Sequence, residues 1–111
     1  MDDRGRNPVW DFIRALPESE RNKCFEYIAC LEETGEGIRR PVGDYLGEKL
    51  YELRPKQTRL IYFFMLKEYA VLVHAFRKKT NQIPWQEIRI ARSRMEDFIR
   101  RVERGALQLE K

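Results

Sequence analysis

Positively charged side chains are concentrated in the middle of this sequence. Residues 49–79 contain eight Lys and Arg residues but only two Glu residues, a local charge of +6, whereas all 111 residues together carry +4. A local excess of this kind indicates a binding site for an anion, and nucleic acid is the first candidate. The alternative is a solvated basic face that has no ligand.

The strands predicted for this segment bring several cations to one edge of a sheet. Arg54 closes a strand that begins at Leu50, and Arg59 opens the next strand, so the turn between them brings the two side chains close. The end of the third strand lies beside Arg59, because the middle strand pairs antiparallel with the third. The cations expected to converge are Arg54, Arg59, Arg77, Lys78 and Lys79.

A cluster of cations favours chemistry on a phosphate group. Positive side chains grip the phosphate and stabilise the extra negative charge of a pentacoordinate transition state. With a ribose 2′-hydroxyl as the nucleophile, such a reaction needs no metal ion in principle. The basic segment has too few carboxylates for a two-metal nuclease. His74 is the single histidine, which excludes a nuclease that uses a histidine pair.

Each of these residues also has a structural interpretation. Arg54 and Arg59 are equally suited to ion pairs with Glu52 or with carboxylates on a helix. Lys78 and Lys79 are as well suited to keeping a loop soluble as to binding a ligand. From these residues alone, the chain is a basic domain that is a candidate for RNA binding.

The histidine and the aromatic residues are assigned first to packing. His74 lies in the middle of a predicted strand, where a core histidine is slightly favoured over a proton donor or base. The aromatic side chains expected to pack in the core or at its rim are Trp10, Tyr62, Tyr69 and Trp85.

The cysteines and the apolar segments predict a cytoplasmic protein. Cys24 and Cys30 lie about 9 Å apart along one predicted helix, too far for a disulfide, and reduced thiols are typical of the cytosol. With a single histidine, the two cysteines do not complete a zinc site. The longest apolar runs fall far short of the ~20 residues of a membrane-spanning helix. No metal, cofactor or membrane is therefore expected.

Helical patterns precede and follow the strands. Asn7-Pro8 is a helix start, and Pro17 interrupts that helix and begins a second one, which ends at Thr34-Gly35. The first two helices are expected to pack as a hairpin. Pro84 opens a last helix with one apolar stripe for docking on the sheet, and Gly105 ends it.

Between the helices the pattern changes to that of a small sheet. Residues 35–47 are rich in glycine and have no sustained period, so they are expected to form a loop. Strands are predicted at residues 50–54, 58–66 and 69–77, and the second is apolar on both faces, as a central strand is. The sequence therefore predicts one α+β domain over residues 1–111. It has an N-terminal helical hairpin, an antiparallel meander of three or four strands and a C-terminal helix packed on the sheet.

Two motifs make the sequence resemble a known toxin family. They are Leu50-Tyr51-Glu52-Leu53-Arg54-Pro55, followed by Arg59 to Phe64, and Val73-His74-Ala75-Phe76-Arg77-Lys78-Lys79-Thr80, followed by Pro84 to Phe98. Upstream, Gly5 to Phe12 resembles the first helix of the same family. Over roughly residues 5–104, the chain resembles the HigB-type branch of the RelE/ParE toxin superfamily, whose members are often described as phage-derived and toxin-like.

The resemblance implies a toxin of a type II toxin–antitoxin pair with a RelE-like fold. Such toxins typically cleave mRNA in the translating ribosome. A helix-turn-helix antitoxin neutralises them, and operator DNA is a further partner expected for the complex. No cofactor is implied. The implied catalytic residues are Arg59, Lys78, Lys79 and His74, and the resemblance also implies Arg54 at the active site. The residues predicted to bind RNA are Arg54, Lys56 and Arg77.

Two other functions stay open at this point. A catalytically degenerate toxin that acts only with an antitoxin, as a corepressor, is one alternative. Members of the family usually have a β-strand before the first helix, whereas here only Met1 to Arg6 precede Asn7. The expected lack of this strand is the reason for the alternative. A gyrase-directed toxin of the same superfamily is less favoured, because relatives with that target generally lack a cluster of catalytic cations.

Overall fold

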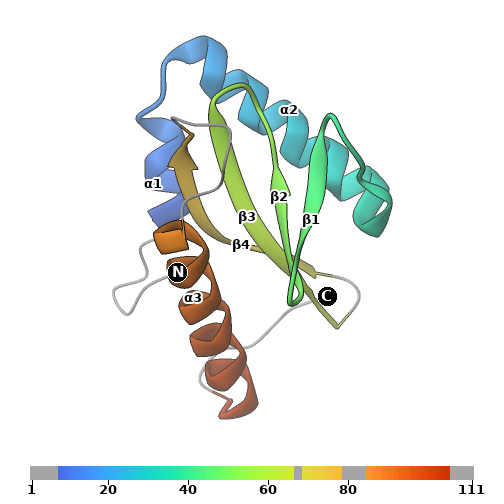
Figure 1. The fold of residues 1–111 in the computed structure, drawn as a ribbon, viewed down its shortest axis with the longest axis vertical. Coiled ribbons are helices and arrows are strands. Elements are labelled where there is room, and N and C mark those ends of the chain that lie inside the picture. Colours follow the sequence, from blue (N-terminus) through green and yellow to red (C-terminus); the bar gives the residue numbers. More distant parts are fainter. Residues whose placement is uncertain (1–7, 67–68, 79–84, 106–111) are drawn as a thin grey trace.

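The predicted helices and strands occur in the predicted order, and one further strand precedes the three predicted ones (Figure 1). The computed structural model describes residues 8–66, 69–78 and 85–105, so Asn7, Lys79 and Pro84 lie outside the described residues. The elements are α1 (Pro8–Arg14), α2 (Glu18–Thr34), the short 3-10 helix η1 (Gly35–Gly37), β1 (Gly43–Gly47), β2 (Leu50–Leu53), β3 (Thr58–Met65), β4 (Tyr69–Arg77) and α3 (Trp85–Glu103). This arrangement confirms the predicted α+β class.

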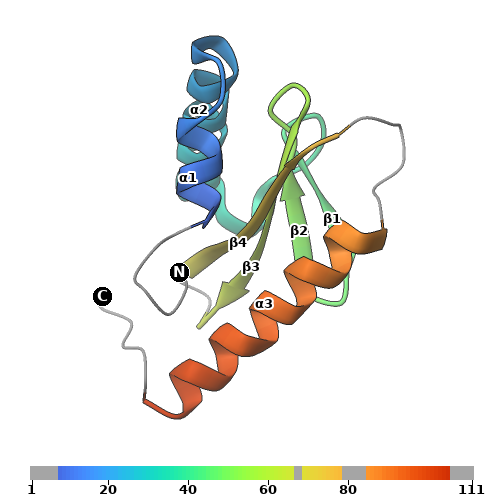
Figure 2. The same cartoon turned by 90° about the vertical axis from the view of Figure 1, so that its left-hand side faces the viewer.

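The sheet separates two groups of helices. Its strand order is β1-β2-β3-β4, and each strand is antiparallel to its neighbour. Figure 2 shows α1 and α2 on one face of the sheet and α3 on the other. The first six residues of β3 are all buried, which confirms that this apolar segment is a central strand.

Alternation of side chains along β3 builds a hydrophobic core on each face of the sheet. Leu60 belongs to the core that contains Ile13 of α1. The next residue, Ile61, belongs to the other core, as does Phe63, whose ring lies 6.0 Å from that of Phe98 in α3. Since alternate residues of β3 pack in different cores, the side to which a residue at the end of this strand points follows from its position in the alternation.

The glycine-rich segment predicted as a loop contains a strand, so that prediction is wrong. Residues Gly43–Gly47 form β1, which pairs with β2 and makes the sheet four-stranded. At Gly43 a Cβ atom would lie 2.6 Å from both the Glu52 carbonyl oxygen and Ile38 Cγ2, so this close approach requires glycine. A strand with glycine at such a position lacks an alternating apolar pattern, which is why the sequence indicated a loop.

The tryptophans differ in their packing. Trp10 stacks on Phe25 with 6.1 Å between ring centroids, as predicted. Trp85 is 70% exposed and lines an open groove beside Leu46 and Leu50, so the predicted packing role is wrong for this residue. Its place in the first turn of α3 leaves it at the margin of the helix contact with the sheet. Tyr62 is buried as predicted, and burial raises its pKa to about 12.

Candidate phosphate-binding site

The start of β3 and the end of β4 lie together, as the sequence predicts. Thr58 pairs with Arg77 across the two strands, and Arg59 pairs with Phe76. One step beyond the last pair, the Lys78 amide donates a 2.6 Å hydrogen bond to the Gln57 carbonyl oxygen. Two of the predicted catalytic cations, Arg59 and Lys78, are therefore at the same end of the sheet.

Side-chain alternation places these two cations on the α3 side of the sheet. Arg59 alternates with Leu60 and so points to the same side as Ile61, which packs in the core beneath α3. Lys78 lies two residues beyond Phe76, which belongs to the same core. Glu52 of β2 is opposite Ile61 in the strand register, so its carboxylate is on this side too.

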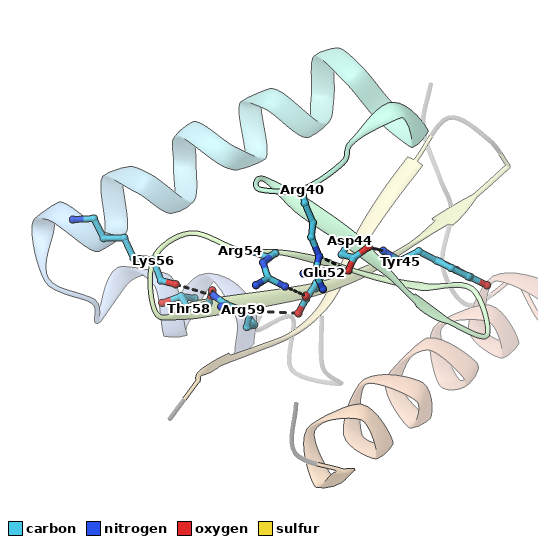
Figure 3. Close-up of polar contacts among 8 residues, drawn as sticks. All are labelled: Arg40, Asp44, Tyr45, Glu52, Arg54, Lys56, Thr58 and Arg59. Atoms are coloured by element: carbon cyan, nitrogen blue, oxygen red, sulfur yellow. Dashed lines mark hydrogen bonds and ion pairs between the residues drawn. The ribbon is translucent and has the colours of Figure 1, made fainter. Parts of the chain in front are cut away.

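Glu52 holds two arginines from a buried position. Its side chain is 1% exposed, and its Oε2 accepts a 2.8 Å hydrogen bond from Arg54 Nη1. Its Oε1 lies 3.9 Å from Arg59 Nε (Figure 3). The ion pairs that the sequence offered as a structural alternative are thus present, and they orient both guanidinium groups at the end of the sheet.

Arg59 is the most buried cation of this group. Its side chain is 10% exposed, and its Nη1 donates hydrogen bonds of 2.8 Å to the carbonyl oxygens of Lys56 and Thr58. Burial, and then the nearby charge of Arg54, lowers the pKa of Arg59. Within the described part of the chain, neither Arg59 Nε nor Glu52 Oε1 has a hydrogen-bond partner. A buried N–H of this kind gains a hydrogen bond when a ligand oxygen reaches it.

Sequence reasoning missed two residues of the site, Arg40 and Asp44. Arg40 precedes β1, and its Nε donates a 2.9 Å hydrogen bond to Asp44 Oδ2. Asp44 is the register partner of Glu52, and the hydrogen bond from Arg40 lowers the pKa of its carboxyl group. The available signal was the pair Arg39-Arg40 shortly before Asp44, in a segment that was predicted to be a loop.

Lys78 completes the group. It is partly buried, and desolvation, followed by the charge of Arg59, lowers its pKa. The charges of Glu52, Arg54 and Arg40 also act on Lys78. These four cations and two carboxylates form the cation cluster, which has a net charge of +2: Arg40, Arg54, Arg59, Lys78, Asp44 and Glu52.

Two of the predicted RNA-binding residues lie away from the cation cluster. The Lys56 ammonium group contacts Ser19 Oγ near the start of α2, and Figure 3 shows its side chain pointing away from Arg59. Arg77 Nη2 donates a 3.1 Å hydrogen bond to Glu20 of α2, on the opposite face of the sheet. Arg77 therefore forms an ion pair with a carboxylate of a helix. The sequence had suggested this kind of ion pair for Arg54 and Arg59.

His74 connects β4 to α3. Its Nε2 lies 2.6 Å from Glu87 Oε2, and its Nδ1 lies 3.1 Å from Arg94 Nη1. Since arginine has no acceptor, the hydrogen-bond network assigns Nδ1 as the acceptor and places the proton on Nε2, which donates to Glu87. Both ring nitrogens thus serve contacts with α3, while the ring stacks on Phe76.

The fold and the site together define an α+β domain that presents a cation cluster at the end of its sheet. The chain belongs to the family described as phage derived protein Gp49-like (DUF891), whose model matches residues 11–96, or 86 of the 111 residues. The matched region contains every residue of the cation cluster. This is a RelE-like, toxin-like family, which confirms the resemblance at that level. No match was found among curated proteins.

Membrane-spanning helices and metal-ligand clusters are both absent from the part of the chain that the structure describes. None of its helices there is long and apolar enough to cross a membrane. Nor do three or more His, Cys, Asp or Glu side chains gather there in a way that could hold a metal ion.

Proposed function

We propose that this protein is the toxin of a type II toxin–antitoxin pair, of the HigB type, and that it cleaves mRNA in the translating ribosome. The observation that carries the proposal is the cation cluster, where the buried guanidinium group of Arg59 is held beside Lys78. Membership in a phage-derived, RelE-like family supports the toxin class.

The proposed ligand of the cation cluster is a phosphodiester group of single-stranded RNA. Phosphate oxygens accept hydrogen bonds from Arg54 and from Arg59, whose Nε contacts Glu52 at 3.9 Å but has no hydrogen-bond partner within the described residues. Arg40 lies at the rim, where its side chain is 67% exposed, and it faces the neighbouring part of the RNA backbone. The net charge of +2 offsets the charge of the phosphate and of the transition state.

The proposed reaction is a transesterification within the RNA. The 2′-oxygen forms a bond to phosphorus, and the bond to the 5′-oxygen breaks, which leaves a 2′,3′-cyclic phosphate and a 5′-hydroxyl. Arg59 stabilises the additional negative charge on the phosphorus oxygens. Lys78, whose lowered pKa makes it a better acid than an ordinary lysine, donates a proton to the 5′-oxygen, and water accepts the proton of the 2′-hydroxyl.

The proposed roles of the other two sequence-predicted catalytic residues differ. Lys79 lies outside the described residues, so its role as a second catalytic lysine stays a prediction. His74 supports the proton transfer less well than Lys78 does, because both of its ring nitrogens bond to α3.

Regulated expression in a bacterium tests the proposal. The wild-type chain is expected to arrest growth and to produce mRNA fragments that map to translated regions. Arg59→Ala and Lys78→Ala should each reduce cleavage by at least about 100-fold. Arg14→Ala is the matched control, since it removes one positive charge from an exposed position on α1. Unchanged arrest in Arg59→Ala would show that the assigned site is wrong.

The alternative is a catalytically degenerate toxin that acts as a corepressor with its antitoxin. Asp44 and Glu52 favour it, because they neutralise two of the four cations of the cluster. It predicts intact mRNA in expressing cells, together with tighter operator binding when the chain is added to its antitoxin. A gyrase-directed toxin would instead alter DNA supercoiling.

The proposed partner is a helix-turn-helix antitoxin encoded by a neighbouring gene. A partner that binds only the folded chain raises its melting temperature through mass action. We expect a clear upward shift when the neighbour-encoded protein is added in excess. No shift, and no complex in size-exclusion chromatography, would contradict the toxin–antitoxin assignment.

A further inference from the structure

A buried carboxylate on the opposite face of the sheet bonds to both strands that carry the cation cluster. Glu20, near the start of α2, is 6% exposed. Its Oε2 accepts a 2.5 Å hydrogen bond from Thr58 Oγ1, and its Oε1 accepts a 3.1 Å hydrogen bond from Arg77 Nη2. Thr58 and Arg77 are opposite each other in the register of β3 and β4. One side chain of α2 therefore links the two strand ends.

Each partner of Glu20 comes directly before a cation of the cluster. Arg59 follows Thr58, and Lys78 follows Arg77. Because successive side chains in a strand point to opposite faces, the partners of Glu20 face α2 while the two cations face the α3 side. Glu20 thus holds the strand ends from the face that the proposed phosphate does not occupy.

The surroundings of Glu20 make these hydrogen bonds strong. Cys24, one helical turn along α2, is completely buried. Burial, and then the charge of Glu20, raises the pKa of the Cys24 thiol to about 11. The Arg77 side chain is 51% exposed, whereas Glu20 and Thr58 are buried, and hydrogen bonds to a buried carboxylate are stronger than those at the surface.

We propose that Glu20 is a positioning residue for the cation cluster, which sets the spacing of Arg59 and Lys78 through Thr58 and Arg77. This inference rests on the proposed function of the cluster. It assigns Arg77 to Glu20 and not to direct contact with RNA. A displacement of either cation by about 1 Å is sufficient to slow a positioned reaction strongly.

Glu20→Gln and Glu18→Gln form a matched pair of variants. Both remove one negative charge from the first turn of α2, but Glu18 is exposed. Glutamine is neutral and has an NH2 group in place of one carboxylate oxygen, so the charge-assisted hydrogen bonds that Thr58 and Arg77 donate to Glu20 are weakened. Net charge alone predicts tighter RNA binding in both variants, whereas the positioning role predicts impaired cleavage in Glu20→Gln alone.

Cleavage of mRNA on purified ribosomes is the first measurement, at a temperature where every variant is folded. We expect kcat to fall by at least about tenfold in Glu20→Gln and to stay within about twofold of wild type in Glu18→Gln. If the wild-type chain cleaves mRNA and Glu20→Gln cleaves at the same rate, the inference is overturned.

Hydrogen exchange of the Lys78 amide is the second measurement, and it requires no RNA. This amide bonds to the Gln57 carbonyl oxygen just beyond the residues that Glu20 holds. We expect its exchange to be at least about tenfold faster in Glu20→Gln, while amides in the middle of β3 keep their wild-type rates. Equal Lys78 rates in the two proteins would overturn the inference, even if wild-type cleavage is absent and the proposed function fails.

A double variant separates positioning from direct RNA contact. In Glu20→Gln/Arg77→Gln the two side-chain amides are able to hydrogen-bond to each other, and the net charge returns to that of wild type. We expect kcat to recover by at least about threefold over Glu20→Gln. A further loss of cleavage on adding Arg77→Gln would instead assign Arg77 to the RNA and overturn this part of the inference.

Discussion

Arg59 shows at the scale of single residues why the candidate site needs arginine. Its Nη1 donates to the carbonyl oxygens of Lys56, in the turn before β3, and of Thr58, the first residue of β3, and its Nε faces the buried carboxylate of Glu52. A guanidinium group can be fixed at one nitrogen and still present other donors to a phosphate, whereas a lysine ammonium is a single point charge. The chain thereby holds one cation rigidly in a partly desolvated place before any ligand arrives.

Glu52→Gln tests the buried carboxylate on which this arrangement depends. The substitution keeps the shape of the side chain but leaves Arg54 and Arg59 without their counter-charge. We expect the free energy of unfolding to fall by about 3 kcal/mol, measured by urea denaturation. Glu48→Gln, an exposed partner of Arg92, is the control and should change it by less than about 0.5 kcal/mol. A similar small change in both variants would mean that Glu52 does not hold the arginines.

The lowered pKa of Lys78 predicts a specific pH dependence of cleavage. The proposed acid must be protonated, so kcat should fall as pH rises through the pKa of Lys78, which lies below the ordinary value of 10.5. In Lys78→Arg the side chain stays protonated, so the fall should move to higher pH or disappear. Lys49→Arg, in the exposed β1–β2 turn, should leave the profile unchanged. A profile that is the same in all three proteins would exclude Lys78 as the acid.

At the scale of elements, α3 is docked on the sheet by polar contacts as well as by its apolar stripe. Arg94 donates to the Val73 carbonyl oxygen and to His74, and His74 donates to Glu87. The pairing of β3 and β4 shifts register between Ile61 and Tyr62, opposite Val73. An irregularity in a ladder redirects side chains locally, and here His74 lies next to it and points at α3.

His74→Ala distinguishes this docking role from proton transfer. Removal of the ring deletes the hydrogen bonds to Glu87 and Arg94, so the free energy of unfolding should fall by about 2 kcal/mol. At a temperature where the variant is folded, the kcat of cleavage should change by no more than about threefold. A loss of 100-fold or more would instead support the catalytic role that the sequence resemblance implies for His74.

At the scale of the whole molecule, the two faces of the sheet carry different polar groups. The face toward α3 carries the cation cluster at one end, and the face toward α2 carries the buried group formed by Glu20, Thr58 and Cys24. Both cysteines are free, as the sequence predicts, and Cys24 has no exposed surface. The stability of the fold is therefore linked to the proton on a thiol that the solvent does not reach.

Cys24 should make the fold less stable at high pH. The unfolded thiol ionises near 9.0, whereas the folded thiol ionises near 11, so between these values the unfolded state has lost the proton that the folded state keeps. The free energy of unfolding should therefore fall as pH rises through this range, by up to about 2 kcal/mol. Cys24→Ala should remove this slope, and Cys30→Ala should retain it. An unchanged slope in Cys24→Ala would assign the effect to other groups, with Tyr62 adding its own contribution above pH 10.

Local sequence patterns were sufficient to predict several elements of this fold. The bounds of β4, Tyr69–Arg77, and the end of α2 at Thr34 coincide with those predicted from apolar periods and from glycine. The meeting of Arg59 with Lys78 was predictable as well, because it follows from antiparallel pairing of neighbouring strands. These features require no knowledge of contacts between segments that are distant in the chain.

The tertiary structure alone decided which charged groups act together. Arg40 joins the cation cluster because β1 forms beside β2 and brings Asp44, the partner of Arg40, next to Glu52. The close approach of β1 to β2 requires Gly43, and no periodic apolar pattern predicts such a strand. Arg77 and Lys78 are adjacent in sequence, yet one bonds to Glu20 and the other faces Arg59. The alternation of side chains along a strand is a local property. The placement of a helix on one face or the other depends on contacts between segments that are distant in the sequence. That choice determines which cations are paired with a buried carboxylate and which remain to bind a phosphate.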